Sequence, residues 1–120
     1  MTDRESQLPD EFDHQQQVEP DWRQLTYDVF NPDHSVGVAC NRDGEVVGLH
    51  ITDDARDNGD TWLAAEIVRL ARLANLKSRV GLRTEMEQKG SHSYTVDSFD
   101  LPTDASYRAI EASEFGSPGA

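Results

Sequence analysis

The sequence predicts an α+β fold in which a three-stranded antiparallel meander is followed by one long helix, with disordered acidic arms on both sides. Two observations support this prediction. Residues 22–52 hold three short runs in which apolar and polar side chains alternate, with turn-like tetrapeptides between them, as expected of half-buried strands. Residues 61–89 repeat apolar side chains at helical spacing, which indicates an amphipathic helix.

The length and composition set limits on the organisation. The 120 residues suffice for one domain, and the apolar share of 36% is low for a fully packed chain. We therefore expect a disordered acidic arm over residues 1–21, a β-β-β-α domain over residues 22–89, and an acidic tail over residues 90–120 with a short helix capped by Thr103 or Asp104. No apolar run approaches the roughly 20 residues that span a bilayer, and the N-terminus has no apolar signal-peptide region, so we expect a cytoplasmic protein.

Both turns of the meander predict the same core face. A two-residue turn at Asp43-Gly44 is a strong hairpin signal, and it pairs Cys40 with Val47, Val38 with Leu49, and Val36 with Ile51. A four-residue NPDH loop pairs Val29 with Val36, Tyr27 with Val38, and Leu25 with Cys40. A slip of one residue in either turn would break this agreement. The opposite face, with Gly37, Ala39, Gly48 and His50, is poor in bulk, so it is either solvated or closely approached by other backbone.

A polar connection leads to the helix, for which Asp60 is a plausible N-cap. The helix ends at or before Gly90, with Gly81 as an alternative earlier stop because an interior glycine costs about 1 kcal/mol. One apolar stripe, expected to cover the sheet, consists of Leu63, Ile67, Leu70, Ala71 and Ala74.

A second apolar stripe on this helix has nothing within the β-β-β-α unit to cover it. Its members are Trp62, Leu73, Leu76 and Val80, and four arginines cluster beside it: Arg69, Arg72, Arg79 and Arg83. Apolar anchors edged by arginine are typical of interfaces. These eight residues are our predicted partner-binding surface, for a homodimer mate or a client protein.

The charge leaves more than one interpretation of the arginines open. The chain has a net charge of -12, and an acidic chain repels phosphate backbones, so nucleic-acid binding is disfavoured. The arginines could bind an acidic partner or nucleic acid. Alternatively, they form a solvated helix face or pair with the acidic arms.

The reactive side chains predict no catalytic, cofactor or metal site, and we expect no enzyme. The single cysteine, Cys40, cannot form an internal disulfide. It faces the core in the predicted register while His50 faces the opposite side, out of reach as a base. The four histidines are scattered, without zinc spacing. The aspartates of residues 53–60 lack the glycine and glutamate of a calcium loop.

The stretch from Phe30 to Arg79 resembles the central domain of the mycobacterial EspH and EspD proteins. The shared features are an N-P turn, a D-G hairpin and a helix of the form LA-x-EI…A-x-LA-x-x-K. The residues that match are Asn31-Pro32, Asp43-Gly44, Leu63-Ala64, Glu66-Ile67, Ala71, Leu73-Ala74 and Lys77. The tail resembles the family's LPTPEEA…EAEVF segment through Leu101-Pro102-Thr103, Glu111-Ala112, Glu114 and Phe115. The meander followed by a long helix also resembles the dimeric YbaB/EbfC nucleoid-associated fold.

The resemblance implies an accessory role in ESX type VII secretion, as a chaperone or adaptor that stabilises a secreted substrate. Two alternatives stay open: a YbaB-like nucleoid-associated DNA-binding protein, and an effector that is itself exported. For the latter, Tyr107 and Glu111 have the spacing of the Tyr-x-x-x-Asp/Glu export signal, a short pattern that also arises by chance.

Overall fold

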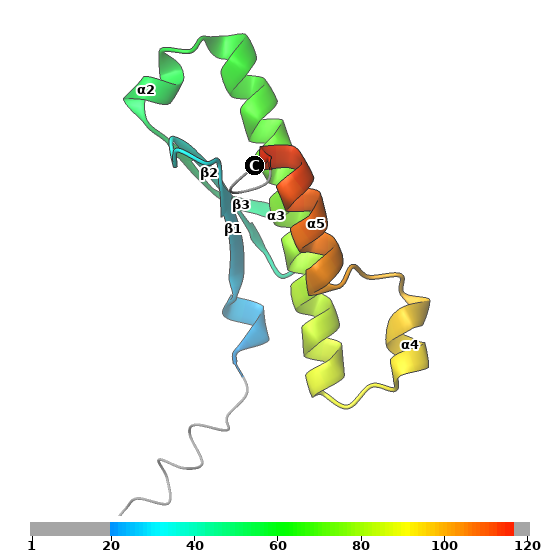
Figure 1. Cartoon of the computed structure of the whole chain (residues 1–120). Coiled ribbons are helices and arrows are strands. Elements are labelled where there is room, and N and C mark those ends of the chain that lie inside the picture. The colour runs from blue at the N-terminus through cyan, green and yellow to red at the C-terminus, as the bar shows by residue number, and fades with distance from the viewer. Residues whose placement is uncertain (1–19, 117–120) are drawn as a thin grey trace, which may run out of the picture.

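Residues 20–116 are described by a computed structural model. They form a three-stranded antiparallel sheet, one long helix and a smaller helical tail (Figure 1). The elements are η1 (Trp22–Gln24), β1 (Thr26–Phe30), β2 (Val36–Asn41), β3 (Val46–Ile51), α2 (Asp53–Arg56), α3 (Asp60–Gln88), α4 (Ser93–Ser98) and α5 (Asp104–Phe115). The strands lie in the order β1-β2-β3. The predicted meander followed by a long helix is therefore confirmed, whereas the arm proposed over residues 1–21 lies almost wholly outside the described residues.

The strands joined by the first turn keep the predicted core face, but the predicted register between β1 and β2 was wrong. Val29 pairs with Val38 and Tyr27 with Cys40, a shift of two residues from the expected pairs. Asn31 is the cause. Its backbone N–H donates to the Val36 carbonyl, and its side-chain oxygen accepts from the Val36 N–H, so the loop begins one residue later. A shift of two leaves every side chain on its original face.

The second turn is a three-residue loop over residues 42–44, not the predicted two-residue turn. The Asn41 N–H donates to the Glu45 carbonyl, and Gly44 has a φ of 86°, the left-handed conformation that this loop type requires. A bulge follows, so Cys40 pairs with Val46 and not with Val47. Beyond the bulge the predicted pairs of Val36 with Ile51 and Val38 with Leu49 are confirmed.

Helix α3 runs unbroken through Gly81, so the alternative of an earlier stop is wrong. Asp60 is the first helical residue, and Gly59 occupies the N-cap position instead. Gly81 has a packing reason: a Cβ atom there would collide with the Tyr27 ring. The absent side chain lets β1 approach the helix closely, which outweighs the low helix propensity of glycine.

The core lies between α3 and the first two strands. It consists of Val29, Val36, Val38, Cys40, Ala55, Leu70, Leu73, Ala74 and Tyr107. The first predicted stripe faces it, since Leu70 and Ala74 are buried and Leu63, Ile67 and Ala71 pack against it. Cys40 is fully buried, as predicted for a small apolar side chain.

The face of the sheet that is poor in bulk is approached by a ring, not by backbone. A Cβ atom on Gly37 would lie 2.5 Å from the Phe30 ring, and Phe30 stacks on His34 and meets His50 edge-on at 5.8 Å. Gly37 pairs with His50 across the strands, which places His50 away from Cys40. The rejection of a Cys40–His50 dyad is confirmed.

Candidate protein-binding surface

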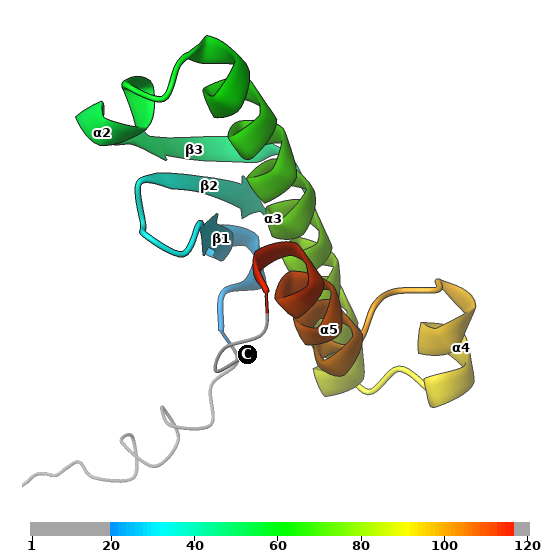
Figure 2. The same ribbon diagram turned by 45° about the horizontal axis from the view of Figure 1, so that its top comes forward.

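Strand β3 forms an edge of the sheet that α3 leaves open. Helix α3 packs on β1 and β2, and Figure 2 shows β3 as the strand at the edge, with α5 on the other side of α3. As a result, residues paired across β2 and β3 differ sharply in exposure to solvent. Cys40 and Val38 on β2 are 0% and 1% exposed, whereas Val46 and Leu49 opposite them are 55% and 53% exposed. The edge strand thus carries apolar side chains on the helix side that nothing in the described chain covers.

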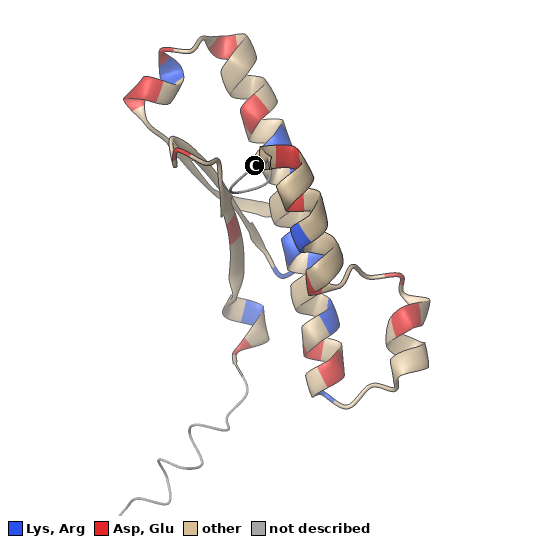
Figure 3. Ribbon diagram, in the orientation of Figure 1, with Lys and Arg blue, Asp and Glu red and all other residues tan. Residues whose placement is uncertain are grey.

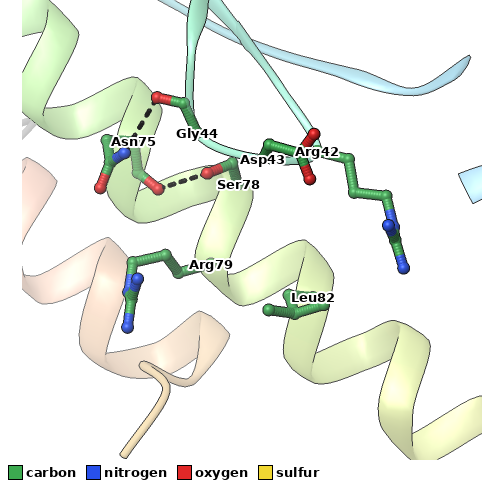
Figure 4. Close-up of a pocket in the computed structure, with 7 residues that line it drawn as sticks. All are labelled: Arg42, Asp43, Gly44, Asn75, Ser78, Arg79 and Leu82. Atoms are coloured by element: carbon green, nitrogen blue, oxygen red, sulfur yellow. Dashed lines mark hydrogen bonds between the residues drawn. The ribbon is translucent and has the colours of Figure 1, made fainter. Parts of the chain in front are cut away.

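A groove follows this open side between β3, its hairpin and α3. Its apolar part has a volume of about 600 Å³ and is lined by Gly44, Val46, Val68, Ala71, Arg72, Asn75 and Leu76. A smaller polar part of about 220 Å³ adjoins it and is lined by Arg42, Asp43, Gly44, Asn75, Ser78, Arg79 and Leu82 (Figure 4). We call the two parts together the β3 trough.

The two parts of the trough meet at a hydrogen bond. The side-chain amide of Asn75 donates to the carbonyl oxygen of Gly44 at 3.1 Å, and both residues line both parts. Figure 4 shows this bond together with the Arg79 side chain, which extends from α3 away from the hairpin. The floor of the trough is therefore held by hairpin–helix contacts and is already formed without a partner.

The hairpin is fixed to α3 by an ion pair between the partly exposed Arg42 and the buried Glu85. Arg42 donates two hydrogen bonds of 2.7 Å to the Glu85 carboxylate, and Lys89 donates a third at 2.9 Å. Hydrogen bonding from Arg42 lowers the pKa of Glu85 to about 2, and Glu85 is only 3% exposed. A bidentate, charge-assisted pair of this kind holds the hairpin, and hence one wall of the trough, in place.

The four predicted arginines divide into two pairs. Arg69 and Arg83 hold the C-terminal tail: Arg69 donates to the Glu114 carbonyl at 2.9 Å and lies 4.8 Å from the centre of the Phe115 ring, while Arg83 donates to the Leu101 carbonyl at 2.9 Å. Within residues 20–116, the side chains of Arg72 and Arg79 form neither a hydrogen bond nor an ion pair. The two arginines without partners are those that line the trough, and the view coloured by charge shows basic residues along α3 (Figure 3).

The second apolar stripe of α3 is partly covered by the tail, an element outside the β-β-β-α unit, and is not left to a partner alone. Helix α5 packs on α3. Its Ile110 and Glu114 close a hollow with Leu73 and Leu76, and Leu73 is buried. Val80 is partly buried, and Trp62 stays 37% exposed. Helical periodicity identifies the stripe but cannot show that the tail folds back onto it.

The sequence offered Thr103 or Asp104 as the cap of α5, and Asp104 is the first helical residue. Thr103 is the N-cap, and it exchanges hydrogen bonds with Ser106 in a capping box. The Tyr107 side chain points into the core, and its hydroxyl donates to Glu111 at 2.9 Å. Burial raises the pKa of the Tyr107 hydroxyl above its ordinary value. Both residues of the predicted export signal thus take part in folding α5, and Tyr107 is inaccessible in the folded chain.

A buried polar network that sequence reasoning missed ties the first loop to α3. The Asn31 side-chain amide donates to Ser35 and to the Glu66 carboxylate, each at 3.0 Å, and Glu66 pairs with Arg69 at 2.7 Å. The signal was the position of Glu66 between the two apolar stripes, where a charged side chain needs buried partners.

The Cys40 thiol and the metal-ligating side chains are the remaining reactive groups of the described residues. Burial raises the pKa of the Cys40 thiol, which lowers its reactivity. Within residues 20–116, His, Cys, Asp and Glu side chains form no group that could hold a metal ion. In the same range, none of the helices is long and apolar enough to cross a membrane.

Comparison with known proteins adds no relative. No family model matches the chain, and neither a curated protein nor a solved structure matches it. The resemblance to the EspH/EspD proteins and to the YbaB fold therefore stays a prediction from the sequence.

Proposed function

We propose that this protein is a non-enzymatic binding module that holds another protein against the β3 trough, as a chaperone or adaptor. The observation that carries the proposal is the preformed apolar groove with exposed Val46 and Val68, and the strand of Val46 also exposes Leu49. Contiguous apolar surface of this kind is a feature of interaction sites in soluble proteins. The sequence resemblance supplies the class of partner, a substrate of ESX type VII secretion, handled in the cytoplasm before export.

Capture of the partner from a host with an ESX locus tests this proposal. The tagged full chain should retain an ESX substrate, and Val68→Asp should abolish retention because it places a charge in the apolar part of the trough. Tyr94→Asp is the matched control, since Tyr94 is also exposed but lies on α4. Recovery of no ESX substrate, or equal recovery with both variants, would refute the proposal.

We also propose a homodimer, formed along the backbone edge of β3. The strand VVGLHI holds neither proline nor a charged residue, the devices that usually keep an edge strand from pairing. Light scattering should give the mass of two chains, and Val47→Lys should give the mass of one. A single-chain mass for the unaltered protein at high concentration would exclude this dimer.

Nucleic-acid binding is the second candidate function, favoured because the Arg72 and Arg79 side chains have no partner among residues 20–116. The net charge of -12 opposes it. Two phosphate contacts would give a logarithmic salt dependence of affinity with a slope of about -2. A gel-shift titration at low salt with the full chain separates the candidates, because the binding-module proposal predicts no shift.

Export of the chain itself can be tested in the same host. Tyr107→Phe keeps the buried ring and Glu111→Gln keeps the helix, so both should fold. If Tyr107 and Glu111 form an export signal, the chain should appear in the culture filtrate, and these variants should reduce its amount there. Presence of the chain in cells alone would support a cytoplasmic adaptor.

A further inference from the structure

We propose that residues 1–19 of this chain occupy its own β3 trough, with Leu8 and Phe12 on the apolar part and the neighbouring carboxylates on Arg72 and Arg79. This inference uses the same surface as the proposed function, but it concerns the chain alone and needs no external partner. It makes the N-terminal segment an internal competitor for the trough.

Charge complementarity is the first argument. Residues 1–19 carry six acidic side chains and one basic one. Arg72 and Arg79 are exposed, line the trough, and have no partner within residues 20–116. Arg42, which also lines it, is already neutralised by Glu85, and Asp43 is the acidic side chain of the polar part. Glu114 likewise shares the hollow under α5 with Arg72. Because neither arginine is paired with its neighbouring carboxylate, the acidic segment and the trough attract one another.

The apolar pattern of the segment is the second argument. Leu8 and Phe12 are its large apolar side chains near the acids Asp10, Glu11 and Asp13. The trough is complementary to this pattern, because its apolar side chains lie next to a basic one: Val46, Val68 and Leu76 next to Arg72. An aromatic anchor in an apolar groove edged by charged contacts is how compact interfaces gain most of their binding energy.

The point at which the segment joins the fold is the third argument. Arg23 lines a hollow together with Asn41, Arg42 and Asp43, so the described chain starts beside the hairpin that walls the trough. Extended chain spans about 3.3 Å per residue, so the stretch from Phe12 to Pro20 reaches roughly 26 Å. That length exceeds the roughly 10 Å between the outer strands of a three-stranded sheet. The tether is long enough to reach the trough without unfolding any element.

Paramagnetic relaxation in the full chain tests the inference. A spin label on Ser6→Cys is selective because Cys40 is fully buried. Amide signals of Gly44, Val46, Val68 and Asn75 should broaden at low salt, and the broadening should fall near 1 M salt, where charges are screened beyond about 3 Å. The charge reversal Arg72→Glu with Arg79→Glu should remove it.

Two controls make the result specific. Arg56→Glu with Arg108→Glu changes the net charge equally at surface pairs and should leave the broadening intact. Adding Asp10→Lys and Asp13→Lys to the reversed chain should restore it. Uniform or absent broadening in the unaltered chain would overturn the inference, and so would broadening that appears only when spin-labelled and isotope-labelled chains are mixed, which would assign the occupant to a second copy. If the trough amides are not broadened but an ESX substrate is still captured, this inference alone is refuted. If the amides are broadened but no ESX substrate is captured, the proposed function alone is refuted.

Discussion

The two long sides of α3 carry similar residues, but one side is covered by the tail and the other is exposed. On one side, Leu73 is buried beneath α5, and Arg69 and Arg83 bind backbone carbonyls of the tail. On the other side, Val68 and Arg72 line the trough. Arg72 also borders the hollow under α5, but its side chain has no hydrogen bond or ion pair within residues 20–116. Because composition barely differs between the sides, the difference lies in which later element packs on each. The candidate binding surface is thus the side that the elements of residues 20–116 leave uncovered.

The largest difference between the two sides of α3 should appear when one apolar side chain is truncated on each. Leu70→Ala removes a fully buried side chain and should lower the free energy of unfolding by about 2–5 kcal/mol. Val68→Ala, on the trough side, should change it by less than about 0.5 kcal/mol. Urea unfolding followed by circular dichroism measures both. Equal losses would mean that something covers the trough side in solution.

The hairpin wall of the trough should depend on acid pH. Because the folded pKa of Glu85 is about 2 and its ordinary value is 4.5, the ionised carboxylate stabilises the fold above pH 4.5. This contribution, at most about 3 kcal/mol because solvent screens the partly exposed Arg42, should be lost as the pH falls from 4.5 towards 2. Urea unfolding at a series of pH values measures the loss, and Glu85→Gln should flatten the curve in this window. An unchanged slope in that variant would show that other carboxylates cause the acid dependence.

Arg69→Ala should loosen the covered side. It removes the ion pair to Glu66, the hydrogen bond to the Glu114 carbonyl and the stacking on Phe115, and it leaves the buried Glu66 without its cation. We expect a loss of about 1–3 kcal/mol and faster hydrogen exchange in α5 than in the sheet. Unaltered exchange in α5 would argue that Tyr107 alone holds the tail.

Arg72→Ala is the matched change on the open side and should have the smallest effect. Arg72 has no ion pair within residues 20–116, so the free energy of unfolding should stay within about 0.5 kcal/mol of its original value. Thermal unfolding measures this. A loss comparable to that of Arg69→Ala would reveal a structural partner for Arg72 and would contradict the division of the arginines into two pairs.

The sequence by itself determined the elements and the faces. Alternation placed Val36, Val38 and Cys40 on the core side, helical spacing placed Leu70 and Ala74 opposite them, and Thr103 marked the start of α5. These features depend on residues a few positions apart, where backbone geometry alone decides which side chains share a face.

The tertiary structure decided what covers each face. Whether α5 folds back onto Leu73, whether α3 reaches as far as β3, and where the bulge beside Cys40 falls all depend on packing between segments distant in the chain. A shift of two residues at Asn31 or a bulge before Gly48 leaves the apolar pattern intact, so periodicity could not detect either. The trough is the clearest example. Its apolar side chains can be identified in the sequence, but their exposure depends on where α3 and α5 pack.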